Sequence, residues 1–205
     1  RDRKLTDWSA AFRSHMLDDD KADNSQEAYL SAFQFSADFK HHLESTGTTR
    51  GFTGPTWAQW VWFDIDRDNI ATALDDTIKL VVCISQRWDT HPDEMLLFFS
   101  GSKGFHVGIP SALWGPEPDV VFHTTCRNLA ECLATLAGVT IDTGVYDRVR
   151  LFRAPNSRHP KTGLHKRTVG SEELFPKTID KNSGCDWVVF RGQPICQIQA
   201  IDAIV

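Results

Sequence analysis

The sequence predicts an α+β fold whose sheet is mostly antiparallel, and three observations support this prediction. Apolar runs of strand length occur at 61–65, 95–99 and 105–109. The last two runs flank the short polar turn 100–104, a pattern typical of a β-hairpin. Apolar residues at helical spacing occur at 69–87, but strands and helices do not alternate regularly along the chain. That irregular order disfavours a doubly wound parallel sheet.

The remaining elements are predicted from the same periodicities. Helical spacing indicates helices at 1–18, 25–43 and 128–137 and from Ser171 onward, and short apolar runs indicate strands at 139–141 and 187–190. Residues 144–163 are expected to form a basic region of loop and strand. The core-facing positions of the first two helices are expected to be Leu5, Trp8, Phe12, Met16, Leu17, Tyr29, Leu30, Phe33 and Phe39.

Composition limits the classes of protein to which the chain can belong. With 205 residues, of which 41% are hydrophobic, it can bury a substantial core, and we treat residues 1–205 as one domain. A net charge of −5 excludes a nucleic-acid binder that is basic overall, but not one with a local basic groove. The sequence has no signal peptide and no apolar run long enough to span a bilayer. Because it begins at Arg1 rather than Met, we expect a fragment of a longer protein.

The cysteines indicate the redox environment. Their number is odd and no CxxC pair occurs, which favours reduced thiols in a cytosolic protein over a disulfide framework or a zinc ribbon. The five cysteines are Cys83, Cys126, Cys132, Cys185 and Cys196.

Two carboxylates, Asp64 and Asp66, lie at the end of the first predicted strand. Successive side chains of a strand point to opposite faces, so Asp64 and Asp66 share one face, while Phe63 and Ile65 share the other. Adjacent carboxylates repel each other unless a cation lies between them, and hard ions such as Mg²⁺ or Mn²⁺ prefer oxygen ligands. Two such ions can stabilise both the attacking and the leaving oxygen of a phosphoryl transfer. The alternative is a strand end with two solvated acids.

Two further segments carry groups that suit an anion. In the turn 100–104, glycines let backbone N–H groups approach an anion, Ser100 supplies a hydroxyl and Lys103 a positive charge, and His106 follows on the next strand. The basic segment 150–163 contains Arg150, Arg153, Ser157, Arg158, His159 and Lys161, which could complement a metal-bound triphosphate. The alternatives are a surface hairpin and a solvated basic loop.

Taken together, these motifs resemble those of the archaeo-eukaryotic primase superfamily. Their order is Phe-Asp-Ile-Asp at 63–66, Ser-Gly-x-Lys-Gly-x-His at 100–106, then a lone Asp followed by Arg-Ala-Pro-x-Ser-x-His-Pro-Lys-Thr-Gly at 153–163. The superfamily includes the small subunit of archaeal and eukaryotic primases, the primase-polymerases, and the polymerase domain of bacterial end-joining ligases. The resemblance covers about residues 60–170, and the stretch 142–146 looks closer to the primase-polymerases.

The resemblance implies a fold and a set of site residues. The fold would be a two-lobed core, in which an N-terminal α/β lobe packs on a palm like that of an RNA-recognition motif. The implied ligands of two Mg²⁺ or Mn²⁺ ions are Asp64, Asp66 and Asp142. The implied contacts to the triphosphate of an incoming nucleotide are Ser100, Lys103, His106, Arg153 and His159.

Asp147 is the other candidate for the third acid. Asp142 follows three β-favouring residues and can therefore lie at a strand end beside Asp64. Asp147 lies among arginines, where pairing with a neighbouring Arg is the simpler explanation.

The implied function is a DNA-dependent nucleotidyltransferase, a primase-polymerase that makes primers or extends DNA. One alternative is an end-joining or gap-filling repair polymerase with the same active site, and another is a replication-initiator DNA-binding domain with a dead site. The implied partners are a single-stranded DNA template, nucleoside triphosphates and, in a longer protein, a helicase or helical accessory domain. No membrane partner is expected, and the expected location is the cytoplasm or nucleoid.

Overall fold

A four-stranded sheet lies at the centre of the computed structural model, which describes residues 4–175, 189–190 and 193–194. Its strands, in spatial order, are β4 (Trp60–Asp66), β6 (Gly104–Pro110), β5 (Leu96–Phe99) and β8 (Arg167–Thr168). Every neighbouring pair is antiparallel, and β5 and β6 form the predicted hairpin. The predicted α+β class with mostly antiparallel sheets is therefore confirmed.

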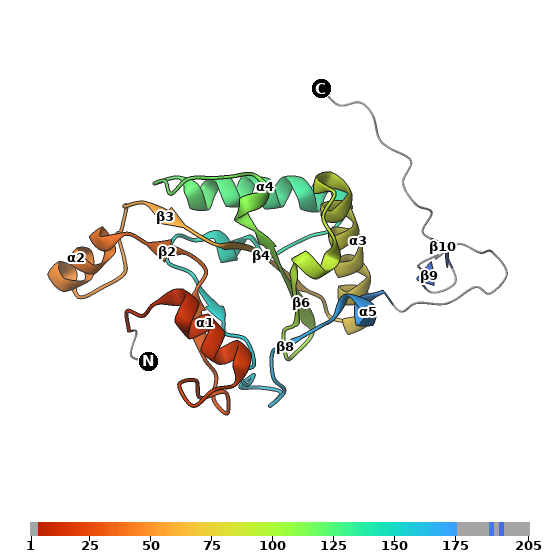
Figure 1. Cartoon of the computed structure of the whole chain (residues 1–205), viewed down its shortest axis with the longest axis horizontal. Coiled ribbons are helices and arrows are strands. Elements are labelled where there is room, and N and C mark those ends of the chain that lie inside the picture. Colours follow the sequence, from red (N-terminus) through yellow and green to blue (C-terminus); the bar gives the residue numbers. More distant parts are fainter. Residues whose placement is uncertain (1–3, 176–188, 191–192, 195–205) are drawn as a thin grey trace, which may run out of the picture.

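Two helices cover one face of this sheet. Figure 1 shows α3 (Ile70–Trp88) and α4 (Phe122–Ala137) on the same side of β4 and β6. The side chains of Phe63, Ile65 and Val107 belong to the buried core, and each is 0% exposed. Because strand side chains alternate, Asp64 and Asp66 lie on the opposite face from Phe63 and Ile65.

Local sequence explains where these helices begin and end. The Asn69 side chain accepts a hydrogen bond from the Ala71 N–H at 2.7 Å and so caps the start of α3. The helix α4 ends at Gly138, whose φ of 67° is the left-handed conformation that glycine adopts without strain. The predicted helix at 69–87 is confirmed, whereas α4 begins six residues before the predicted start of 128.

The N-terminal segment lies on the other side of the sheet. It contains α1 (Trp8–Leu17) and β1 (Tyr29–Ser31), and β1 pairs with β7 (Leu151–Arg153) from the basic segment. Figure 1 shows α1 and α3 on opposite sides of β6. Phe12 and Met16 pack against the core, but Leu5 and Leu17, predicted core residues, are 56% and 69% exposed.

The predicted helix at 25–43 is wrong over most of its length. The structure has β1, then β2 (Gln34–Phe35), which pairs with β3 (Thr56–Trp57), and only then α2 (Ala37–Thr46). Pairing with strands distant in the sequence outweighs the local helical pattern here. A start signal was nevertheless present, because Ser36 occupies the N-cap position and Asp38 the first turn of α2.

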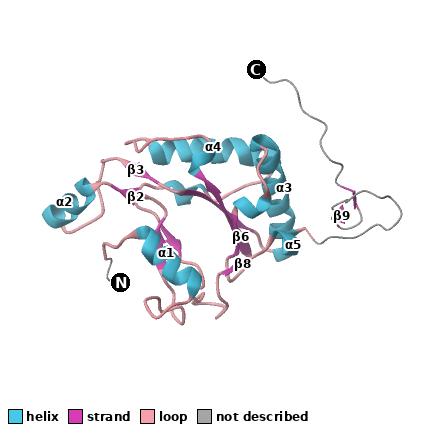
Figure 2. Cartoon of the chain, in the orientation of Figure 1, coloured by secondary structure: helices cyan, strands magenta, loops and turns pink. Residues whose placement is uncertain are grey.

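The predicted strand at 139–141 is not formed either. That segment connects α4 to a short 3-10 helix, η3 (Thr143–Tyr146), and it meets β4 through a single backbone hydrogen bond rather than a ladder. Figure 2 distinguishes such loops from the helices and strands. The remaining short elements are η1 (Pro92–Glu94), η2 (Ser111–Leu113), α5 (Ser171–Leu174), and β9 (Val189–Phe190) paired with β10 (Gln193–Pro194).

Two expectations extend beyond the described part of the chain. Of the late strand predicted at 187–190, only 189–190 can be compared, and they form β9. Cys83, Cys126 and Cys132 are free thiols, whereas Cys185 and Cys196 lie outside the described residues. Within the described ranges, no helix has the length and apolar character needed to cross a bilayer.

Candidate functional site

Asp64 and His106 are the centre of the candidate site. They are direct partners in the β4–β6 ladder, and His106 Nε2 lies 3.6 Å from Asp64 Oδ1. The ring of His106 packs on Phe152 with 4.3 Å between ring centroids, and its side chain is 6% exposed. Burial, and then the charges of Lys166 and Arg153, lower the pKa of His106 well below its ordinary value. His106 is therefore a neutral imidazole at pH 7.

The surroundings of Asp64 disfavour its ionised form. Burial, and then repulsion by Asp66 and Asp142, raises its pKa to about 7, although Lys166 and Arg150 oppose the shift. Its Oδ1 is buried and accepts no hydrogen bond from the described residues. A buried carboxylate oxygen without a donor is costly, so this position favours a proton or a bound cation.

The other two predicted acids adjoin Asp64. Asp66 ends β4 and is exposed. The backbone N–H of Asp142 donates to the carbonyl oxygen of Asp64 at 2.9 Å, which places Asp142 beside β4 without a strand. One Asp142 oxygen accepts from the Gly144 N–H at 2.8 Å, and the other lies 3.8 Å from an Arg150 nitrogen. Asp142 is thus held by backbone contacts on both sides.

The donor set fits a hard divalent cation. Among the described residues, no three histidine, cysteine or carboxylate side chains are arranged to hold a metal ion by themselves. Mg²⁺, however, is usually bound through one or two carboxylates, with phosphate oxygens and waters completing its shell. The orphaned Oδ1 of Asp64, with two further acids close enough to raise its pKa, meets that requirement.

The predicted anion-binding turn lies next to Asp66. The Ser100 N–H donates to the Gly104 carbonyl at 2.9 Å, and the Ser100 hydroxyl is buried with no hydrogen-bond partner in the described part of the chain. Lys103 points elsewhere, because its Nζ lies 3.4 Å from Asp68 and half of its side chain is exposed. The turn therefore contains a buried hydroxyl without a partner in the described part of the chain, whereas Lys103 is paired with Asp68.

The predicted basic loop packs against this turn. The Thr162 hydroxyl donates to the Gly101 carbonyl, and a Cβ at Gly101 would lie 3.3 Å from the Cβ of His159. Burial and then the charges of Arg153 and Lys161 lower the pKa of His159, while Asp66 opposes the shift. The structure therefore brings Arg153 and His159 to the side of the turn that adjoins Asp66.

At Gly104 the turn and β4 approach each other closely. A Cβ there would collide with Asp66 Oδ1 and the Ile65 carbonyl, and would lie 3.1 Å from the Asp66 Cα. We expect Gly104→Ala to lower the free energy of unfolding by about 3 kcal/mol, the upper end for overpacking. Urea unfolding measures this.

Gly115→Ala is the matched control for the Gly104 prediction. Gly115 has a φ of 60° and open space around it, so only backbone strain of about 1–2 kcal/mol is expected. Equal losses for the two variants would contradict the close approach at Gly104.

Lys166 belongs to the site although the sequence pattern did not single it out. It is 0% exposed, and its Nζ lies 4.5 Å from the Phe152 ring centroid and 4.6 Å from that of Phe98. The ammonium donates to the Arg153 carbonyl at 2.8 Å. Burial lowers the pKa of Lys166 well below its ordinary value, and the charge of Asp64 acts against this. Its neighbours His165 and Arg167 are exposed, so the sequence resembled a solvated basic run.

The N-terminal segment also builds the site, although the resemblance did not extend to it. The Arg153 guanidinium lies 5.4 Å from the Tyr29 ring centroid, and Tyr29 is its partner in the β1–β7 ladder. The Asn156 side chain donates to the backbone carbonyls of His15 and Met16, at 2.8 and 3.2 Å. These contacts attach the basic loop to the N-terminal segment, and none of them could be predicted from the loop sequence alone.

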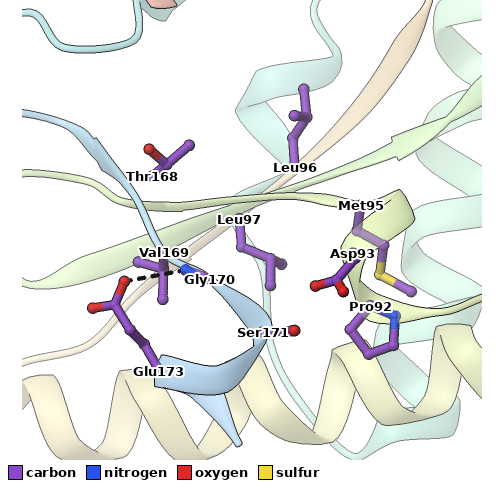
Figure 3. Close-up of a pocket in the computed structure, with 10 residues that line it drawn as sticks. All are labelled: Pro92, Asp93, Met95, Leu96, Leu97, Thr168, Val169, Gly170, Ser171 and Glu173. Atoms are coloured by element: carbon purple, nitrogen blue, oxygen red, sulfur yellow. Dashed lines mark hydrogen bonds between the residues drawn. The ribbon is translucent and has the colours of Figure 1, made fainter.

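A separate cavity of about 360 Å³ lies along β5, β8 and α5. Figure 3 shows the carboxylates of Asp93 and Glu173 among its lining residues, and Glu173 accepts from the Gly170 N–H at 3.1 Å. Among the described residues that line it, none is basic and none is a predicted site residue. These two carboxylates pair with His91, 3.3 Å from Asp93, and with Arg167, 2.9 Å from Glu173. A cavity lined by carboxylates does not suit a triphosphate, so this cavity is not the candidate site.

The site therefore combines three acids at the end of β4, a turn with a buried hydroxyl, and a basic loop braced by the N-terminal segment. The three sequence motifs, which lie far apart in the chain, adjoin one another in the structure. No protein-family model matches this sequence, and no curated protein is significantly similar to it, so its function has to be inferred from the site itself.

Proposed function

We propose that this protein is a DNA-dependent nucleotidyltransferase of the primase-polymerase kind. It would join an incoming nucleoside triphosphate to a primer 3′-hydroxyl, or to a first nucleotide, with release of pyrophosphate. The fold that we propose is the two-lobed core of the archaeo-eukaryotic primases. The resemblance of the three motifs to that superfamily supports both proposals.

The observation that carries the proposal most strongly is the buried Oδ1 of Asp64, which has no hydrogen-bond partner among the described residues. Burial and the neighbouring Asp66 and Asp142 raise the pKa of this carboxyl group. Structural carboxylates are usually paired with a cation or hydrogen-bonded, which lowers their pKa. A buried acid with neighbouring acids and an unsatisfied oxygen is more typical of a functional site. The basic loop beside Asp64 distinguishes this site from one that only binds a proton, because its positive charges can bind a polyanion.

The proposed roles divide between the acids and the basic groups. Asp64, Asp66 and Asp142 would hold two Mg²⁺ or Mn²⁺ ions, which when bound lower the pKa of the attacking hydroxyl and neutralise the leaving group. Arg153 and His159 would bind the triphosphate, and the Ser100 hydroxyl would donate to a phosphate oxygen. His106, a neutral imidazole, would orient Asp64 and offer an N–H to the site. The contribution of the chain is mainly positioning and electrostatics.

The role of Lys103 and the surface that would bind the template are assigned less directly than the roles of the acids and Arg153. Lys103 pairs with Asp68 at 3.4 Å on an exposed surface, so it could turn to the triphosphate at little cost. The template is expected to approach the exposed end of β4 at Asp66, because α3 and α4 cover one face of the sheet and the N-terminal segment packs on the other.

Incubation of the protein with single-stranded DNA, all eight nucleotides and Mn²⁺, with and without a primer, tests the function. The expected result is template-dependent incorporation. Faster filling of a gap that carries a 5′-phosphate would favour a repair polymerase. DNA binding without any incorporation would favour an initiator domain with a dead site and would overturn the proposal.

Arg153→Ala tests the triphosphate role. Removing a charge-assisted hydrogen bond is expected to cost about 1.5–3 kcal/mol, equivalent to a rise in nucleotide KM of about 10- to 150-fold. DNA affinity and its salt dependence should change little, since we place Arg153 on the nucleotide. Arg158→Ala is the control, because Arg158 is an exposed arginine of the same loop whose Nε donates to the Gly163 carbonyl. A large loss of DNA binding with unchanged KM would move Arg153 to the template.

A further inference from the structure

Arg67 follows the last acid of β4 and reaches two segments of the candidate site. Its Nη1 donates to the Asp66 carbonyl and its Nη2 donates to the Thr140 carbonyl, each at 2.7 Å. Its backbone N–H also donates to the Lys103 carbonyl at 3.4 Å, at the end of the anion-binding turn. The Arg67 side chain is 18% exposed, whereas Asp66 and Thr140, whose carbonyls it contacts, are exposed residues.

The carbonyl of Thr140 matters because of where Asp142 lies. The segment 139–142 forms no strand, and its backbone link to β4 is the hydrogen bond from the Asp142 N–H to the Asp64 carbonyl. The Arg67 guanidinium adds a second link two residues earlier, from Asp66 to Thr140. Arg67 therefore fastens the segment that carries the third acid to the strand that carries the first two.

Asp76 on α3 fixes the orientation of Arg67. Its Oδ2 accepts from Arg67 Nε at 2.9 Å and lies 2.9 Å from Arg67 Nη2. Its Oδ1 accepts from Lys79 Nζ at 2.8 Å. Because the guanidinium is planar and rigid, the contact of Nε and Nη2 with Asp76 directs Nη1 at the Asp66 carbonyl and Nη2 at the Thr140 carbonyl. Asp76 also offsets a positive charge that would otherwise oppose cation binding nearby.

We propose that Arg67 is a positioning residue that sets the spacing between Asp66 and Asp142, and through it the affinity of the candidate site for a divalent cation. This inference rests on the proposed function, because it takes those acids to be the cation ligands. Residues that orient metal ligands commonly change metal affinity by about 10- to 100-fold when they are replaced. No contact of Arg67 with substrate is needed for this role.

The test is a titration of metal-free protein with Mn²⁺, in which free Mn²⁺ is followed by its electron paramagnetic resonance signal. Arg67→Met, which keeps an unbranched apolar stem but donates no hydrogen bond, is expected to bind Mn²⁺ about 10- to 100-fold more weakly than the parent. Lys79→Met is the matched control, because Lys79 contacts the same Asp76 but neither Asp66 nor Thr140. It is expected to bind Mn²⁺ like the parent.

Each result of the Mn²⁺ titration either supports or overturns the inference about Arg67. Unchanged Mn²⁺ affinity in Arg67→Met overturns the inference, and so does an equal loss in Lys79→Met, which would assign the effect to the charge of Asp76. If Arg67→Met does not fold by circular dichroism, Arg67→Lys replaces it. A lysine can keep the pair with Asp76 but not both carbonyls, so parental affinity would again overturn the inference.

A third variant separates this inference from the proposed function. Asp64→Asn removes a proposed ligand, and it should weaken Mn²⁺ binding whatever Arg67 does. If Asp64→Asn binds Mn²⁺ like the parent, the proposed metal site fails and the role of Arg67 fails with it. If Asp64→Asn loses Mn²⁺ while Arg67→Met does not, only the role of Arg67 fails.

Discussion

Asp64→Asn is expected to abolish nucleotide incorporation and, in the absence of metal, to make the protein more stable. The loss of activity follows from removing a proposed metal ligand, since several kcal/mol of transition-state stabilisation correspond to about 10³-fold or more in rate. The gain in stability follows from the raised pKa of Asp64, because the ionised carboxylate is buried beside two other acids. A variant that loses function while gaining stability is the mark of a site held under electrostatic strain.

The raised pKa of Asp64 determines how the free energy of unfolding changes with pH. The pKa of Asp64 is about 7 in the folded protein, against an ordinary value of 3.8. Between these values the folded state binds more protons than the unfolded state, so this residue makes the free energy of unfolding fall as pH rises from about 4 to 7. At about 1.4 kcal/mol per pKa unit, the penalty is about 4 kcal/mol above pH 7 and absent below pH 4. Asp64→Asn removes that penalty.

The measurement is urea unfolding of parent and variant at several pH values in a metal chelator. The difference in free energy of unfolding should be near zero at pH 4 and largest above pH 7. Mn²⁺ should then stabilise the parent at pH 8 but not the variant, because only the folded parent binds the ion. Asp93→Asn, an exposed acid in η1, is the control and should show neither effect. A pH-independent difference would contradict the raised pKa.

The parts of the fold that the sequence predicted best are those governed by local pattern. The alternation at 61–66 correctly placed Asp64 and Asp66 on the face opposite Phe63 and Ile65. The hairpin around 100–104 was predictable because its glycines are required by a close approach that only glycine allows. In both cases the information lies within a few residues of the feature.

The parts that could not be predicted depend on pairing between distant segments. The strand β1 exists because it pairs with β7, more than a hundred residues later, and the helical spacing at 25–43 gave no sign of this. The role of Arg67 depends on Thr140, and the burial of Lys166 depends on rings from three strands, β4, β5 and β7. Charged residues next to exposed ones resemble solvated residues until the surrounding side chains are known.

The choice between Asp142 and Asp147 as the third acid can be settled by a matched pair of variants. Burial, then Asp66 and then Asp142 raise the pKa of Asp64, with no resolved contribution from Asp147. Asp147 is exposed, and its charge acts instead on two other groups. Burial lowers the pKa of His123 and Asp147 opposes that shift, while Glu131, and to a lesser extent Asp147, raises the pKa of Arg127. The geometry therefore favours Asp142, as the sequence did, but for a different reason, since the expected strand at 139–141 is absent.

We expect Asp142→Asn to lose incorporation by about 10²-fold or more and to bind Mn²⁺ more weakly, while Asp147→Asn keeps most of its activity. Both variants should fold. Asp142 caps η3 through the Gly144 N–H at 2.8 Å, and asparagine caps as well as aspartate does. Without metal, Asp142→Asn should also melt at a higher temperature at pH 8, because it removes one source of repulsion on Asp64. An inactive Asp147→Asn beside an active Asp142→Asn would reverse the assignment and move the third ligand to the far end of η3.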